Sequence, residues 1–144
     1  MYVKDVMHSE VTSAPLGTPV QDAFEIMRDG GFRHLPILDE FGQVAGILSD
    51  RDLRSVGAVY KDDATGTEDF LVTEDTTVDK IMSAKPFSVS PDDSVSFAID
   101  IIRGKRIGCL VVSQGGEMVG VLSYMDLLDA LKKILEKPAQ ESAA

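Results

Sequence analysis

Apolar residues recur with a helical period in two segments of this chain. Both segments place them at positions i, i+3, i+4 and i+7, the spacing of a helix that buries one face. The positions are Val20, Ala23, Phe24 and Met27 in the first segment and Val95, Ala98, Ile99 and Ile102 in the second. The sequence therefore predicts two equivalent amphipathic helices.

Polar residues and glycines indicate where these helices begin and end. Thr18-Pro19-Val20-Gln21 has the spacing of a capping box with proline at the first helical position, and Ser90-Pro91-Asp92-Asp93 is a near equivalent. Gly30-Gly31 is expected to end the first helix, and Gly104 the second.

Short extended segments are expected on either side of each helix. The predicted ranges are 11–14, 34–38 and 43–48 in the first half, and 87–90, 107–113 and 117–122 in the second. A further helix begins at Ser49 and at Ser123, and the later one is longer. Each half is thus predicted to be β-α-β-β-α.

The two halves also share sequence motifs at an almost constant offset. Val3-Lys4-Asp5-Val6-Met7 returns as Val78-Asp79-Lys80-Ile81-Met82, 75 positions later. Gly46-Ile47-Leu48-Ser49-Asp50-Arg51-Asp52 returns as Gly120-Val121-Leu122-Ser123-Tyr124-Met125-Asp126, 74 positions later. A repeat that keeps both its start and its end indicates a duplicated structural module.

We therefore predict an α+β fold of two repeats, packed sheet to sheet with pseudo-twofold symmetry. One repeat of about 55 residues is too small to bury both a sheet face and a helix stripe by itself. The predicted domains are repeat 1 at 1–57, an acidic linker at 58–77 with room for a strand at 70–72, repeat 2 at 78–136, and a flexible C-terminal tail at 137–144.

The composition limits the classes of partner. A net charge of −10 argues against nucleic acid, because binding to its backbone is driven by lysine and arginine. No apolar run approaches the roughly 18 residues that a membrane span needs, and the N-terminus does not resemble a signal peptide. The single cysteine, Cys109, permits no intramolecular disulfide. A cytoplasmic location is the resulting expectation.

Two Ser-x-x-Asp pairs are the first candidate binding groups. A carboxylate such as Asp52 or Asp126 can accept hydrogen bonds from both hydroxyls of a ribose, and Ser49 or Ser123 can donate to a phosphate or sugar oxygen. The same spacing is that of a helix capping box. On spacing alone capping is the simpler interpretation, and one residue can serve both purposes.

A basic cluster is the second candidate, and only the first repeat has it. Arg33, His34, Arg51 and Arg54 fall close to the predicted strand and helix starts, which suggests a phosphate site. The alternative is surface charge, with Arg51 and Arg54 paired to neighbouring aspartates. In the second repeat Gly108-Cys109 and Tyr124-Met125 replace the basic residues, so the two sites are not expected to be equivalent.

Taken in order, these motifs resemble a tandem pair of CBS domains, also called a Bateman module. The matching residues are the Val-x-x-Val/Ile-Met starts, Arg33-His34-Leu35-Pro36-Ile37 and the two Gly-h-h-Ser-x-x-Asp endings, where h is apolar. The resemblance implies a regulatory unit that dimerises into a disc. Its clefts commonly bind AMP, ADP, ATP or S-adenosylmethionine.

The resemblance also implies which residues contact the ligand in the cleft between the repeats. At site 1 they are Thr12, Phe32, Arg33, His34, Pro36, Ser49, Arg51 and Asp52. At site 2 they are Phe87, Ile107, Gly108, Cys109, Val111, Ser123 and Asp126. Phe87 could give the adenine an aromatic face, although a phenylalanine in this setting is as often part of the core.

The expected function is a non-catalytic sensor that binds an adenine nucleotide as a regulatory ligand, with no required cofactor and no metal. No Ser-His-Asp order, glycine-rich phosphate loop or metal-ligand spacing points to an enzyme. The expected partners are a second copy of the chain and an unknown effector protein. Two alternatives remain: a ligand-free dimerisation or docking module, and a binder of S-adenosylmethionine or NAD.

Overall fold

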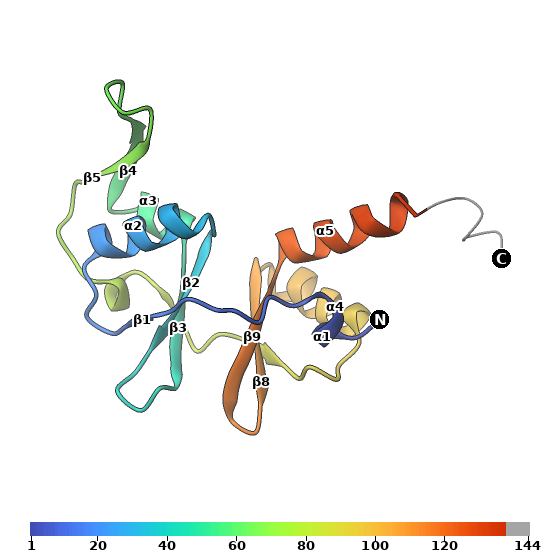
Figure 1. Ribbon diagram of the computed structural model, residues 1–144. Coiled ribbons are helices and arrows are strands. Elements are labelled where there is room, and N and C mark those ends of the chain that lie inside the picture. Colours follow the sequence, from blue (N-terminus) through green and yellow to red (C-terminus); the bar gives the residue numbers. More distant parts are fainter. Residues whose placement is uncertain (138–144) are drawn as a thin grey trace. The chain divides into compact units, whose positions relative to one another are not determined.

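The computed structural model describes residues 1–137 and divides into two compact units (Figure 1). The central unit is Thr12–Pro86. The terminal unit combines Met1–Val11 with the chain from Phe87 onward. Both units mix helices with a small sheet, so the predicted α+β class with two repeats is confirmed.

The central unit is built on a four-stranded sheet with the order β1-β2-β3-β6. Its strands are β1 (Ala14–Pro15), β2 (His34–Leu38), β3 (Val44–Ser49) and β6 (Ser83–Ala84). Strand β1 is parallel to β2, and the other pairs are antiparallel. Its helices are α2 (Val20–Gly30), α3 (Asp50–Arg54) and the 3₁₀ turn η1 (Val78–Lys80). The apolar stripe of α2 is buried in the core of this unit, as its spacing predicted.

The terminal unit repeats this plan with a three-stranded sheet, β7-β8-β9. Its strands are β7 (Ser88–Val89), β8 (Cys109–Gln114) and β9 (Glu117–Ser123), and its helices are α1 (Val3–Val6), α4 (Val95–Lys105) and α5 (Tyr124–Leu135). Its core cluster is Val3, Val89, Ala98, Ile102, Leu110, Val112 and Leu122.

Each unit contains the start of the other repeat, so the compact units divide the chain differently from the repeats expected at 1–57 and 78–136. His8 bridges to Val121 of β9, and β6, near the start of repeat 2, pairs with β3 of repeat 1. Glycines make room for these segments. A Cβ on Gly46 would lie 2.8 Å from the Ser83 carbonyl oxygen, and one on Gly120 2.8 Å from that of His8.

Two helix boundaries differ from the predictions. Helix α2 begins at Val20 with Pro19 as its N-cap, which offers no capping side chain, and the Thr18 hydroxyl donates to the Pro15 carbonyl at 2.7 Å. In the second repeat Ser94 caps α4 by accepting the Phe97 N–H at 3.0 Å.

The prediction for Ser90-Pro91-Asp92-Asp93 was therefore wrong. The Ser90 N–H donates to the Asp93 carboxylate at 2.8 Å, which closes a turn before α4 and does not cap the helix. At the other end, Gly31 ends α2 in the left-handed conformation, as predicted, with φ of 71°. Gly104 does not end α4, which continues to Lys105 with Arg106 as its left-handed C-cap.

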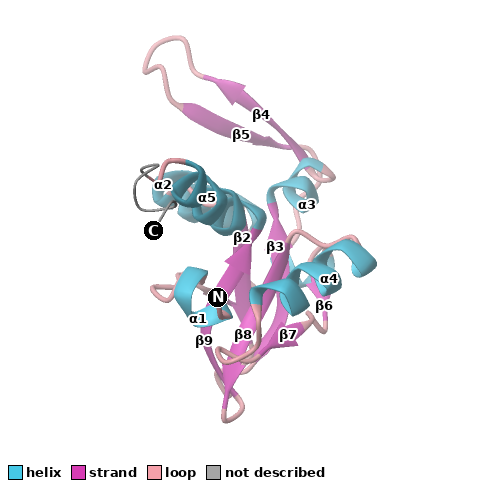
Figure 2. Ribbon diagram, turned by 90° about the vertical axis from the view of Figure 1, so that its right-hand side faces the viewer, coloured by secondary structure: helices cyan, strands magenta, loops and turns pink. Residues whose placement is uncertain are grey.

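The segment expected as an exposed linker, 58–77, is largely a β-hairpin of β4 (Gly57–Lys61) and β5 (Glu68–Val72). Figure 2 shows it standing above α3. The hairpin is anchored by Phe70, which is only 4% exposed and stacks on Phe24 with ring centroids 5.1 Å apart. The sequence alone does not reveal this anchor. Phe70 lies in an acidic segment, and its partner Phe24 is far away in the chain.

Candidate functional site

Both repeats fold the serine motif into the same strand–helix corner. In the central unit His34 pairs with Ser49 across β2 and β3, and the Asp50 N–H donates to the Arg33 carbonyl at 3.0 Å. We call residues 33–34 and 49–52 the first corner.

The second corner is the equivalent set, residues 108–109 and 123–126. There Cys109 pairs with Ser123, and the Tyr124 N–H donates to the Gly108 carbonyl at 3.2 Å. The register of the sheets thus brings the two halves of each predicted motif together, which spacing alone did not establish.

Each Ser-x-x-Asp pair forms a reciprocal capping box. The Asp52 Oδ2 accepts the Ser49 N–H at 2.8 Å, and the Ser49 Oγ accepts the Asp52 N–H at 3.1 Å. Asp126 Oδ2 likewise accepts the Ser123 N–H at 2.9 Å. The capping alternative is therefore realised. Within residues 1–137, the Oδ1 atoms of both aspartates accept no hydrogen bond, so one oxygen of each fixed carboxylate remains available.

The two serine hydroxyls differ in what they still offer. Ser123 Oγ donates to Asp126 Oδ2 at 3.1 Å, so its hydrogen is used inside the cap. Ser49 Oγ accepts the Asp52 N–H but donates to no described residue. The first corner therefore keeps one hydrogen-bond donor that the second corner uses internally.

The two corners also differ in charge. Arg33 and Arg51 are exposed, and neither forms an ion pair with any residue from 1 to 137. In the second corner Cys109 replaces His34, and burial, with a smaller effect of the Asp126 charge, raises the pKa of its thiol to about 12. The thiol is therefore neutral at physiological pH, and residues 108–109 and 123–126 include no basic residue.

Other predicted contact residues are less clearly gathered. Phe87 lies beside β8, because its carbonyl accepts the Val111 N–H at 3.0 Å. The Phe87 ring is 44% exposed and lies 5.2 Å from the Lys105 ammonium. Thr12 is exposed ahead of β1, and Pro36 is buried within β2. Ile107 is half-buried and packs against the core of the terminal unit.

Phe32 and Arg33 line a different surface of the central unit. Both border an open hollow between α2, α3 and the hairpin, and none of Ser49, Arg51 and Asp52 lines it. Of the residues predicted for site 1, Phe32 and Arg33 border this hollow, and Ser49 and Asp52 form the capping box.

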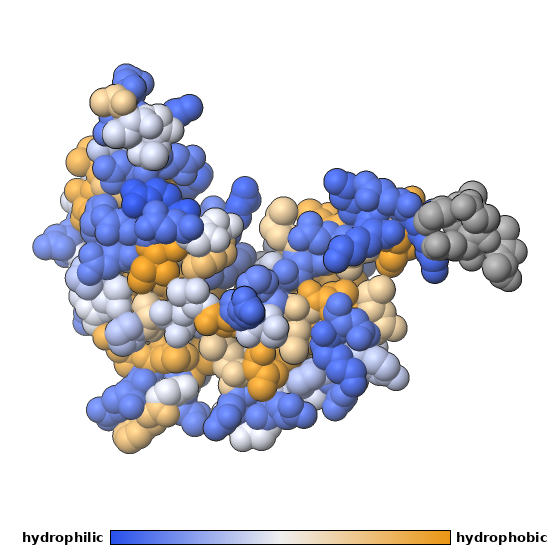
Figure 3. Space-filling view, viewed as in Figure 1, coloured by the Kyte–Doolittle hydropathy of each residue, from blue (hydrophilic) through white to orange (hydrophobic). Residues whose placement is uncertain are grey.

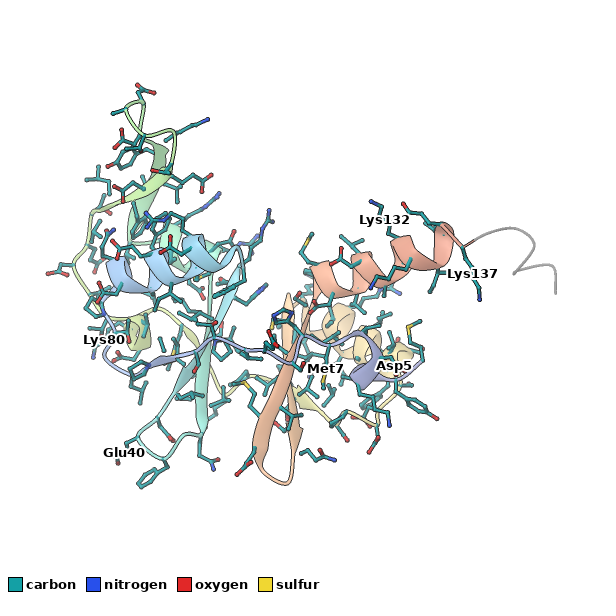
Figure 4. All side chains as sticks on the ribbon, in the orientation of Figure 1. Asp5, Met7, Glu40, Lys80, Lys132 and Lys137 are labelled. Atoms are coloured by element: carbon teal, nitrogen blue, oxygen red, sulfur yellow. The ribbon has the colours of Figure 1, made fainter. Side chains whose placement is uncertain are left out.

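Sequence reasoning missed the part that the start of repeat 1 plays in the terminal unit. A cavity of about 440 Å³ lies between α1 and α5, and its lining includes Asp126 together with Met7 and His8. Asp5 and Lys137 also line this cavity, and Figure 4 labels them together with Met7. The close approach of His8 to Gly120 was signalled only by the glycine that opens each Gly-h-h-Ser-x-x-Asp motif.

Two other kinds of functional feature are absent from the described residues. Among residues 1–137 no helix is both long and apolar enough to cross a membrane. In the same part of the chain no three His, Cys, Asp or Glu side chains gather as a metal site.

Comparison with known proteins identifies the repeats. The family model described as CBS domain matches twice, at residues 3–58 and 78–133. An uncharacterized protein of Methanocaldococcus jannaschii, MJ1404, is 33% identical over 128 residues, which is 88% of this chain. The chain spans only 27% of the length of that relative.

Solved structures share the fold. The CBS domain pair of protein MJ0100, in complex with 5′-methylthioadenosine and S-adenosyl-L-methionine, matches with a TM-score of 0.76 and 20% identity, covering 93% of this chain and 98% of that one. CBSX2 in complex with AMP matches with a TM-score of 0.69 and 21% identity, covering 94% of this chain and 98% of the other.

Proposed function

We propose, on the premise that this chain belongs to the CBS domain family and carries two copies of the domain, that it is a non-catalytic regulatory module for an adenosine-containing ligand. AMP, ADP or ATP is the expected ligand class. Tandem CBS domains are regulatory modules, and two proteins of the same fold are described in complex with AMP or with S-adenosylmethionine and methylthioadenosine.

The capped aspartates carry this proposal. The capping box holds Asp52 Oδ2 against the backbone and leaves Oδ1 without a partner in the described chain, and Asp126 repeats the arrangement. A fixed carboxylate oxygen can accept a ribose hydroxyl without first losing side-chain entropy. Capping and ligand binding thus use opposite oxygens of the same group.

The two corners are expected to favour ligands that differ in charge. The first corner has Arg33, Arg51 and the available hydroxyl of Ser49, which suit the phosphates of ADP or ATP. The second corner has a neutral buried thiol at Cys109. It would suit AMP poorly and an adenosine or a sulfonium-bearing ligand better.

The test is isothermal titration of AMP, ADP, ATP, NAD and S-adenosylmethionine into protein that has been unfolded and refolded to remove carried-over ligand. Asp52→Asn keeps an oxygen to accept the Ser49 N–H but removes the charge that a ribose would meet. Losing a charged hydrogen-bond acceptor is expected to weaken binding about ten-fold or more.

A matched control separates this effect from a loss of local structure. Asp93 accepts the Ser90 N–H at 2.8 Å in the same Ser-x-x-Asp spacing but lies in the turn before α4. Asp93→Asn should leave the affinity unchanged. Equal affinities for wild type, Asp52→Asn and Asp126→Asn would reject the proposed ribose contact, and silence from all five ligands would favour a docking module.

Arg51→Gln tests whether Arg51 contacts the phosphates of the bound nucleotide. It is expected to weaken ATP more than AMP, because a longer phosphate chain brings more negative charge toward the guanidinium. S-adenosylmethionine, whose sulfonium is positive, should bind equally well to both proteins. A uniform loss for all ligands would indicate that Arg51 supports the helix and does not read phosphates.

We also propose that the module is a homodimer. Four apolar residues of α5 are about half exposed or more: Leu128, Leu131, Ile134 and Leu135. Light scattering during gel filtration should give the mass of two chains, and Leu131→Glu should reduce it to one. Lys132→Glu, next to it on the same helix, should leave the dimer intact. A monomeric wild-type protein at all concentrations would contradict this proposal.

A further inference from the structure

The central unit has a hollow of about 410 Å³ bordered by α2, α3 and the β4–β5 hairpin. Its position is distinct from the capping box, because Ser49 and Asp52 do not line it. The hairpin supplies one wall through Val59 and Glu68. Figure 3 shows strongly hydrophilic residues where the hairpin meets α2.

The hairpin wall is held firmly to the unit. Phe70 is buried against Phe24, and Gly57 lies so close to the Phe70 ring that any side chain there would overlap it. Arg28 Nη1 donates to the Glu68 carbonyl at 3.2 Å, which ties the end of α2 to β5. Because the walls are already anchored, no loop has to become ordered when a ligand binds. The entropic cost of binding is therefore lower.

The lining combines an apolar floor with arginine side chains. Phe24 is 6% exposed and Leu53 is 2% exposed, and the partly buried Phe32 lies beside them. A floor of this kind contacts an apolar group and removes its surface from water.

Two of the arginines in the lining form no ion pair with any described residue. Arg28 is held by Asp29 at 2.9 Å and lies over the Phe24 ring. Arg33 and Arg54 form no ion pair with any described residue. The opposing carboxylates of the lining are Asp50 and Glu68. Because Asp29 balances Arg28, the guanidinium groups left to hold an anion are those of Arg33 and Arg54.

We propose that this hollow binds a small anion with a single charge and an apolar group, such as a monocarboxylate. The guanidinium groups of Arg33 and Arg54 hold the carboxylate by charge-assisted hydrogen bonds, and the apolar group lies on the phenylalanine floor.

The second repeat provides an internal comparison. At the positions of Arg33 and Arg54 it has Gly108 and Leu128. The second repeat therefore lacks both arginines. The site belongs to the central unit alone, and it shares Arg33 and Asp50 with the first corner.

The test uses phenylacetate as the probe in ¹H–¹⁵N NMR titrations of the whole chain at constant ionic strength. A ligand of about ten non-hydrogen atoms in an open hollow is expected to bind with a Kd in the millimolar range. Saturable shifts should fall on the amides of 31–33, 50–54 and Val59. The neutral isostere phenylacetamide should bind at least about ten-fold more weakly than phenylacetate.

Two variants on the same short helix decide the result. Arg54→Gln should weaken phenylacetate about ten-fold, whereas Arg51→Gln, which lies outside the hollow, should not change it. Both side chains are exposed, and well-dispersed spectra would show that each variant folds. Shifts that do not saturate, equal binding of phenylacetamide, or equal losses in both variants would overturn the proposal.

Discussion

Replacing Gly120 by alanine tests how the start of repeat 1 is held in the terminal unit. An added Cβ would lie 2.8 Å from the His8 carbonyl oxygen and 3.0 Å from the Met7 sulfur. The thioether can move aside, because methionine is flexible. The carbonyl cannot move freely, since His8 and Val121 exchange two backbone hydrogen bonds of 2.9 and 3.0 Å.

The cost follows from comparing the two ways to relieve this overlap. Keeping the segment in place and absorbing the overlap costs about 1–3 kcal/mol, as for other overpacked sites. Releasing it costs about 1–3 kcal/mol for the two hydrogen bonds and about 1.5–3 kcal/mol more for exposing Val3, which is fully buried. Strain is the cheaper outcome. Alanine regains about 0.4–1 kcal/mol by restricting the unfolded chain.

We therefore expect Gly120→Ala to lower the free energy of unfolding by about 1–2 kcal/mol, the difference between these terms. Urea unfolding measures this loss, and hydrogen exchange of the Val121 amide, which donates to His8, reports whether the segment has loosened. Gly104→Ala is the matched control, because nothing lies within 4 Å of its added Cβ in helix α4. It should stabilise the protein by about 0.5–1 kcal/mol. Stabilisation by both substitutions would refute the close-approach argument.

Three further outcomes can be measured on the same protein. Ser94→Ala should cost about 1 kcal/mol in urea unfolding, because it removes the cap of α4, while Ser96→Ala inside that helix should be neutral or slightly stabilising. Phe70→Ala should cost about 3–5 kcal/mol by undocking the hairpin, and Leu71→Ala on its exposed side less than about 0.5 kcal/mol. The pKa of Cys109 is raised in the folded state from 9.0 to about 12, so the stability that it contributes is fully present below pH 9.0 and is lost between pH 9.0 and about 12, as the unfolded thiol ionises first. Alkylation of Cys109 at pH 8 should accordingly be slow until urea unfolds the protein, and rapid alkylation of the native state would contradict this burial.

Local patterns predicted most of the elements, because their causes are local. The apolar stripe that includes Val20 and Met27 has a helical period, and α2 buries that stripe. Strand β2 has the predicted limits, His34 to Leu38. The helix caps were predicted less well, since several serines, threonines and aspartates compete for the same few backbone groups. Thr18 hydrogen-bonds to Pro15 instead of capping α2, and this choice depends on the path of the preceding turn.

The candidate site was predictable only in part for the same reason. The Ser-x-x-Asp spacing predicted both the capping box and a fixed carboxylate, and the structure has the box at Asp52 and Asp126. Side-chain directions do not follow from spacing. Spacing did not indicate, for example, that Phe32 and Arg33 border the hollow near the hairpin.

By itself the sequence determined that the chain is a duplicated α+β module, because repeated motifs and apolar periods are written in the order of residues. The tertiary structure decided which segments complete each unit. His8 closes on Gly120, and Ser83 closes on Gly46, across long stretches of chain. It also decided that Phe70 docks the acidic segment as a hairpin. These contacts depend on shape complementarity between residues far apart in sequence, and no local pattern records them.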